Sequence, residues 1–249
     1  MVSKFLLQNM RERKLNVSEV IARSDHLFNS GNGSAVGEHL RSALAEACSL
    51  GDKSGELTVL SELMGYYRMA GDRERGLQSV ADGLKLLDEL QIRNTVSGGT
   101  ILINAATVLL AFEEAEKALI LYTEAYGYFE HLNDNDPLLA ALFNNMASAY
   151  AACGEMETAG AYYLAAADIL EVNGKLMDQA TALVNLARLG GKTAEFLDRA
   201  MACFDHPQAV RDGYYAHTAK KCAGAFGEYG QFDRQNELEK RAQEIYERH

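Results

Sequence analysis

The sequence has little proline, no tryptophan and no long apolar run. Only 2 of its 249 residues are proline, while alanine, leucine and glutamate are frequent. Few helix breakers among many helix formers predict an all-α protein. No stretch approaches the roughly 20 apolar residues that span a bilayer. Residues 1–14 lack the apolar core of a secretory signal, so we expect no membrane partner.

Positive charge is also scarce. The 24 Lys and Arg are outnumbered by 35 Asp and Glu, which gives a formal net charge of −11. An acidic surface repels phosphate backbones, so we expect no direct nucleic-acid partner. The four cysteines, Cys48, Cys153, Cys203 and Cys222, form no CxxC pair and lie on apolar helical patterns. We expect them to be small buried side chains of a reducing compartment, and we expect a cytoplasmic protein.

Motifs for catalysis, cofactors and metals are missing. Residues 31–34 (GNGS) match neither a phosphate loop nor a nucleophile elbow, and they predict a helix cap. Residues 133–137 (NDNDP) lack the glycine and distal glutamate of a calcium loop, and they predict a turn before a helix. His206 and His217 have no ligand spacing. We therefore expect no enzyme, no cofactor and no metal site.

What the chain does have is an internal repeat. A small residue is followed four positions later by a bulkier residue, and three positions after that by another small residue. The clear copies are Gly76/Val80/Gly83, Ala118/Tyr122/Ala125 and Ala159/Tyr163/Ala166. Fainter copies lie around Leu40, Leu197 and Phe226, and the period is about 41 residues.

Each copy predicts a helical hairpin. An apolar first helix precedes the small residue, and a turn such as Ala70-Gly71-Asp72 or Cys153-Gly154-Glu155 joins the two helices. Small residues let the backbones approach, and bulky residues fill the space beside them. One hairpin cannot bury its apolar face alone, so stacked hairpins forming a solenoid are favoured over an ordinary bundle. The turn at residues 190–192 predicts a shorter fifth hairpin, or a bend.

The best-preserved copy resembles the tetratricopeptide repeat (TPR) family. The matching residues are Ala147, Tyr150, Gly154, Ala159, Tyr163 and Ala166. The long period resembles the branch typified by kinesin light chains and bacterial peptide-sensing regulators, although the usual proline after the second helix is missing. The resemblance covers residues 17–247. It implies a right-handed α-solenoid of about six TPR-like hairpins over residues 17–249, with residues 1–16 as an N-terminal helix or extension.

In such arrays the first helices line the concave surface, and a row of amides is expected there. Asn104, Asn145 and Asn185 share one register, and Asn144 precedes Asn145. An asparagine amide pairs with both the N–H and the C=O of an extended peptide. The alternative is that these amides bond adjacent hairpins to each other. Three further candidates follow the small residue of the first helix: Thr107, Ser148 and Arg188.

Charge adds two more candidates. Residues 175–221 hold seven basic and five acidic residues, although the whole chain is acidic. Arg188, Lys220 and Lys221 fall on first helices, where they could receive an acidic side chain or a terminal carboxylate. A solvated helix face is the alternative.

We therefore expect a non-enzymatic module that binds an extended peptide or a protein partner on its concave face. One alternative is a regulatory receptor whose superhelix closes around a signalling peptide. Another is a homo-oligomeric scaffold held by exposed apolar residues of a terminal helix, namely Val2, Phe5, Leu6 and Leu7 or Leu238 and Ile245.

Overall fold

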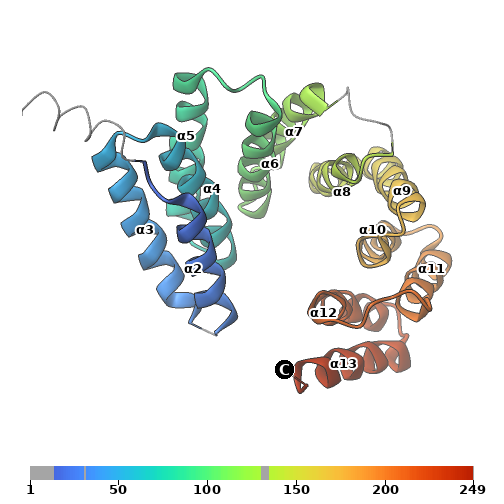
Figure 1. Ribbon diagram of the computed structural model, residues 1–249. Coiled ribbons are helices and arrows are strands. Elements are labelled where there is room, and N and C mark those ends of the chain that lie inside the picture. Colours follow the sequence, from blue (N-terminus) through green and yellow to red (C-terminus); the bar gives the residue numbers. More distant parts are fainter. Residues whose placement is uncertain (1–13, 31, 130–134, 249) are drawn as a thin grey trace, which may run out of the picture. The chain divides into compact units, whose positions relative to one another are not determined.

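The computed structural model describes residues 14–30, 32–129 and 135–248, and every regular element in these ranges is an α-helix (Figure 1). Consecutive helices pair into six hairpins, which confirms the predicted all-α repeat architecture. The pairs are α2 Val17–Asn29 with α3 Gly33–Leu50, α4 Lys53–Ala70 with α5 Arg73–Leu90, α6 Val96–Ala111 with α7 Ala115–Phe129, α8 Pro137–Ala152 with α9 Met156–Val172, α10 Leu176–Arg188 with α11 Thr193–Asp205, and α12 Gly213–Glu228 with α13 Phe232–Tyr246.

The chain divides into two compact units of three hairpins each. Unit 1 is Met1–Phe129 and contains α2 to α7, while unit 2 is Glu130–His249 and contains α8 to α13. Helix α2 begins at Val17, where the Asn16 side chain accepts a hydrogen bond from the Glu19 N–H. Residues 1–13 lie outside the described residues, so the division between 1–16 and 17–249 stays a prediction.

The turns inside the hairpins follow from their sequences. Gly71 ends α4 with φ +69°, a left-handed conformation that costs glycine little, and Asp72 then caps α5 through the Arg75 N–H. Gly154 has φ +84° between α8 and α9. Asp136 caps α8 through the Leu138 N–H, directly before Pro137. These positions confirm the predicted turns and the predicted helix start.

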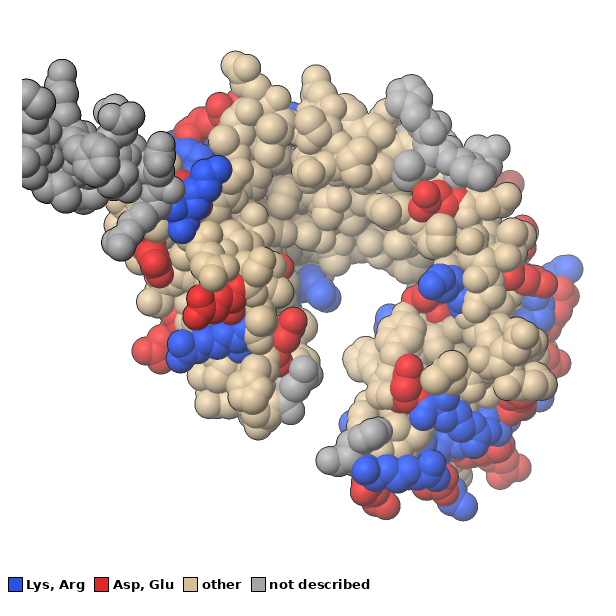
Figure 2. Space-filling view, in the orientation of Figure 1, with Lys and Arg blue, Asp and Glu red and all other residues tan. Residues whose placement is uncertain are grey.

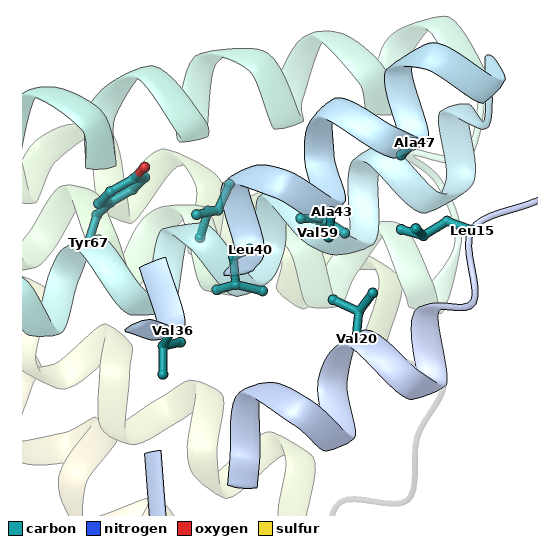
Figure 3. Packing of buried hydrophobic residues seen from close by; sticks show 9 residues of the cluster. Leu15, Val20, Val36, Leu40, Ala43, Ala47, Val59 and Tyr67 are labelled. Carbon is teal, nitrogen blue, oxygen red and sulfur yellow. The ribbon is translucent and has the colours of Figure 1, made fainter. Parts of the chain in front are cut away.

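In unit 1, apolar side chains from the first three helices form one cluster. Val20 of α2, Leu40 of α3 and Val59 of α4 are buried between these helices (Figure 3). Leu15, which precedes α2, joins the cluster, and its N–H donates to Asp52 Oδ2 at 3.0 Å. Burying each such leucine or valine contributes roughly 1.5–3 kcal/mol, so the first helix is held mainly by this cluster.

In unit 2 the small residues of the repeat bring the helices together. Ala147 of α8 and Ala159 and Ala166 of α9 are fully buried, and Tyr163 packs beside Ala147. The fifth hairpin is shorter than the fourth, as predicted, with 13 residues in each of α10 and α11 against 17 in α9. Gly190 and Gly191 both have positive φ in the turn between α10 and α11.

Two expectations about apolar residues are wrong. Cys203 and Cys222 are buried, but Cys48 is exposed and Cys153 is half-exposed. Cys48 follows the buried Ala47 by one residue, about 100° around the helix, so it points away from the core. Leu238 and Ile245 are buried, so they give α13 no apolar surface for self-association.

The exposed surface of α13 is mostly charged, with Phe232 and Tyr246 exposed at its two ends. Its exposed side chains include Asp233, Glu237, Glu239, Lys240 and Glu244. Figure 2 shows positive and negative side chains intermixed at this end of unit 2. The other proposed association residues, Val2, Phe5, Leu6 and Leu7, lie outside the described residues. No described helix has both the length and the apolar character needed to cross a membrane.

Candidate functional site

A groove of about 470 Å³ crosses the first helices of the three hairpins of unit 2. Helices α8, α10 and α12 form its walls, near their N-terminal ends. Its apolar lining comes from Pro137, Ala140, Ala141 and Leu170, and its polar lining comes from Asn144, Asn145, Lys175, Asp178, Thr181, Tyr214, His217, Thr218 and Lys221. An apolar surface with several hydrogen-bonding groups is typical of a non-covalent binding site.

Two of the predicted asparagines in unit 2 bond to each other. Asn185 Nδ2 of α10 donates to Asn144 Oδ1 of α8 at 3.2 Å, which links adjacent hairpins. Asn145 lies beside them, half-buried in the groove lining, and its amide has no hydrogen-bond partner among the described residues. No described residue therefore uses the donors or the acceptor of the Asn145 amide.

Asn104 belongs to unit 1 and has a structural partner there. Its Nδ2 atom donates to Ser61 Oγ of α4 at 2.8 Å. Asn104 and Asn185 thus make the inter-hairpin bonds that the alternative interpretation expects, while a binding role for the row of amides stays a prediction.

Thr107 and Ser148 bond within their own hairpins. The Thr107 hydroxyl lies 3.0 Å from the Tyr122 hydroxyl, and the Ser148 hydroxyl lies 2.7 Å from the Tyr163 hydroxyl. Each also donates to the carbonyl oxygen four residues earlier in its helix. Ser148 is not part of the groove lining.

The three basic candidates occupy different places. The Arg188 guanidinium donates to both carboxylate oxygens of Glu228 at 3.0 Å, and these bonds lower the pKa of Glu228. Lys221 lines the groove. Lys220 is exposed and lies outside the lining. Of the three, only Lys221 belongs to the groove lining.

A contact between Tyr214 and Asp178 joins α12 to α10 at the groove. The Tyr214 hydroxyl donates to Asp178 Oδ1, and both residues belong to the first turn of their helices. Burial, together with this hydrogen bond and the negative charge of Asp178, raises the pKa of Tyr214. The phenol is therefore protonated at neutral pH and acts as the donor.

Solved structures share this fold. A protein of nearly identical TPR-like repeats from Podosopora anserina superposes with a TM-score of 0.57 at 16% identity, over 76% of this chain and 94% of that chain. The chain has a TPR-like helical-repeat fold. The apo form of RapI gives a TM-score of 0.68 at 14% identity, over 95% of this chain and 85% of RapI. A Rap protein complexed with Competence and Sporulation Factor gives a TM-score of 0.57 at 15% identity, over 91% of this chain and 73% of that chain.

No protein-family model matches the sequence, and no curated protein matches it. The TPR-like fold of this chain is therefore seen in its structure and in the repeat pattern. No cluster of three His, Cys, Asp or Glu side chains is placed to hold a metal ion within the ranges that the structure describes.

Sequence reasoning missed several groove residues of this TPR-like chain. Lys175, Asp178 and Tyr214 lie at the N-terminal ends of α10 and α12, away from the repeat's small residues that set the register of the predicted site. A signal was available, because residues one period apart lie at equivalent places in successive hairpins. Asn185 follows Asn144 by 41 residues, which matches the period. Tyr214 follows Asp178 by only 36 residues, because the fifth hairpin is shorter.

Proposed function

We propose that this TPR-like chain is a non-enzymatic, cytoplasmic interaction module, and that the groove over α8, α10 and α12 binds an extended peptide or protein segment. The observation that carries the proposal is the Asn145 amide. It is half-buried in the groove lining and has no hydrogen-bond partner among the described residues. One amide supplies both a donor and an acceptor, which is what the backbone of an extended peptide requires.

The dimensions suit a short peptide. Neighbouring helices pack roughly 8–10 Å apart, so three first helices extend over about 20 Å. An extended chain rises about 3.3 Å per residue, and about six residues therefore cross the groove. Its volume of about 470 Å³ also lies within the usual range of ligand sites, roughly 300–1,000 Å³.

The comparison with solved structures supports ligand binding by this fold. A Rap protein with a similar arrangement of helices was solved as a complex with Competence and Sporulation Factor. The same fold therefore holds a ligand in at least one protein.

The test is peptide selection followed by mutation of one amide. A displayed library of nine-residue peptides is selected on the full chain, and the affinity of enriched peptides is measured for Asn145→Ala. We expect about a tenfold loss of affinity, because the loss of one or two hydrogen bonds costs about 1.4 kcal/mol. Thermal unfolding should be nearly unchanged, since Asn145 has no partner in the described protein.

Asn104→Ala is the matched control. It removes the bond from Asn104 Nδ2 to Ser61 Oγ in unit 1, so it should lower stability by about 1 kcal/mol and leave affinity unchanged. If no peptide is enriched, or if the enriched peptides bind Asn145→Ala as tightly as the natural chain, the groove is not the peptide site.

A further inference from the structure

The groove carries the opposite charge from the rest of the chain. The formal net charge of the protein is −11. Among the described residues, the groove lining holds two lysines, Lys175 and Lys221, against one carboxylate, Asp178. The described part of the lining therefore has a net positive charge, and the His217 imidazole also belongs to it.

The two lysines are available to a ligand. Neither Lys175 nor Lys221 forms a salt bridge with any residue that the structure describes. Glu228 accepts from Arg188, and Glu171 accepts from Arg199 and Gln179, so neither of these carboxylates pairs with a groove lysine. An anionic group entering the groove would thus meet cations without a fixed counter-charge.

The one carboxylate among the described residues of the lining is held by its neighbour. The Tyr214 hydroxyl donates a hydrogen bond to Asp178 Oδ1, which directs that oxygen toward α12. Asn144 adds to the asymmetry, because its Oδ1 atom already accepts from Asn185 while both of its N–H groups remain for a ligand. Donors and cations therefore predominate over acceptors in the groove.

We infer that the groove prefers peptides that carry an acidic side chain, and that Tyr214 sets this preference by holding the Asp178 carboxylate away from the ligand. The inference rests on the proposed function, because it names the class of peptide that the same groove takes. Lys221 and Lys175 contact the acidic side chain, Asn145 contacts the peptide backbone, and Tyr214 acts through Asp178 as a positioning residue.

Three fluorescein-labelled probes test the preference. They are nine-residue Gly-Ser peptides with Glu, Gln or Lys at the same three positions, acetylated and amidated so that no terminal charge remains. Fluorescence anisotropy with the full chain at about 50 mM salt should show the Glu peptide binding about fivefold more tightly than the Gln peptide, and the Lys peptide most weakly. Fivefold corresponds to about 1 kcal/mol, the upper end for an exposed charge pair.

Lys221→Gln should remove most of the advantage of the Glu peptide over the Gln peptide. Lys220→Gln is the matched control, because Lys220 is adjacent, equally charged and exposed, but outside the groove lining. It should change every affinity by less than about twofold. Equal losses with the two variants would mean that the chain attracts the peptide by its overall charge, and the preference would not belong to the groove.

Tyr214→Phe tests the positioning role. Loss of the hydroxyl frees Asp178, so the ratio of Glu-peptide to Lys-peptide affinity should fall about fivefold. Adding Asp178→Asn should restore the ratio, which a merely structural role of Tyr214 would not allow. An unchanged ratio in Tyr214→Phe, or no restoration in the double variant, would overturn this role.

The failures of the inference and of the proposed function are distinguishable. If the natural chain binds Glu and Gln peptides equally and Asn145→Ala weakens both, the groove binds peptides without a charge preference, and the inference alone is wrong. If none of the probes and no selected peptide binds, both are wrong.

Discussion

Tyr122 and Tyr163 each reach from the second helix of a hairpin to a hydroxyl on the first. Their partners are Thr107 and Ser148, at 3.0 and 2.7 Å. Both tyrosines are almost fully buried, so these hydrogen bonds satisfy phenol groups that would otherwise lose solvation without compensation. Because the equivalent hydrogen bond occurs in two hairpins, it is a feature of the repeat.

Tyr163→Phe should therefore lower the free energy of unfolding by about 1 kcal/mol, because the Ser148 hydroxyl loses a partner. Urea denaturation followed by circular dichroism measures the change. Tyr246→Phe is the control, since Tyr246 is partly exposed and has no hydrogen-bond partner among the described residues, and its stability should not change. Equal stability of Tyr163→Phe and the natural chain would show that the bond contributes nothing.

The same residues show how far sequence reasoning reached at this scale. The repeat register placed Thr107 and Ser148 on the ligand side, one position after the small residue. A helix turns about 100° per residue, so one position decides whether a side chain faces the groove or the second helix. The repeat pattern alone does not predict this rotation about the helix axis. The structure shows it, because the Thr107 and Ser148 hydroxyls contact the buried hydroxyls of Tyr122 and Tyr163.

At the scale of elements, the start of α6 depends on a glycine. A Cβ atom at Gly98 would lie 2.3 Å from the Ile92 carbonyl oxygen and 2.6 Å from that of Arg93. These atoms belong to the backbone that connects α5 to α6, so they move only if the connection moves. Arg93 also holds this connection to α7 through Glu124, with bonds of 2.6 and 2.9 Å.

Gly98→Ala should destabilise the protein by about 1–3 kcal/mol, because overpacking forces the backbone to shift. The measurement is the midpoint of thermal unfolding. Gly127→Ala in α7 is the comparison: no atom lies within 4 Å of the added Cβ, so alanine should stabilise the helix by roughly 0.5–1 kcal/mol. If both variants shift the midpoint in the same direction, close packing at Gly98 is not the cause.

Hairpin bounds were more predictable than the partners between hairpins. Gly71, Gly154 and Pro137 are local signals, and helices end or begin beside them. The groove needs Asp178 and Tyr214 together, and these are 36 residues apart. No local pattern predicts such a contact, which follows only from stacking the hairpins in the correct register. Cys48 was misplaced for a related reason, since an apolar residue beside the buried stripe also fits an amphipathic pattern.

At the scale of the molecule, the free energy of unfolding should fall as the pH rises above 9. Burial raises the pKa of Cys203 and of Cys222 to about 11 from an ordinary value of 9.0. Burial likewise raises that of Tyr122 from 10.0 to about 12. At a pH between the ordinary and the raised pKa of each group, the unfolded chain releases a proton that the folded chain keeps. Unfolding is therefore favoured as the pH rises.

The free energy of unfolding should thus be insensitive to these thiols below pH 9 and fall between pH 9 and pH 11, with Tyr122 extending the fall toward pH 12. Urea titrations across this range measure it. A Cys203→Ala, Cys222→Ala double variant should show a shallower fall between pH 9 and pH 11. An identical slope in the double variant would exclude the buried thiols as the cause.

The bond between Asn185 and Asn144 has an evolutionary consequence. The Asn144 amide accepts a hydrogen bond that the Asn185 amide donates. A substitution at either residue therefore leaves the other, half-buried amide without its partner. Across homologous chains, positions 144 and 185 should therefore covary. Position 145 has no such constraint within the protein, so it should instead diverge between homologues that bind different ligands. Two identical neighbouring residues, Asn144 and Asn145, would then evolve under separate selective pressures.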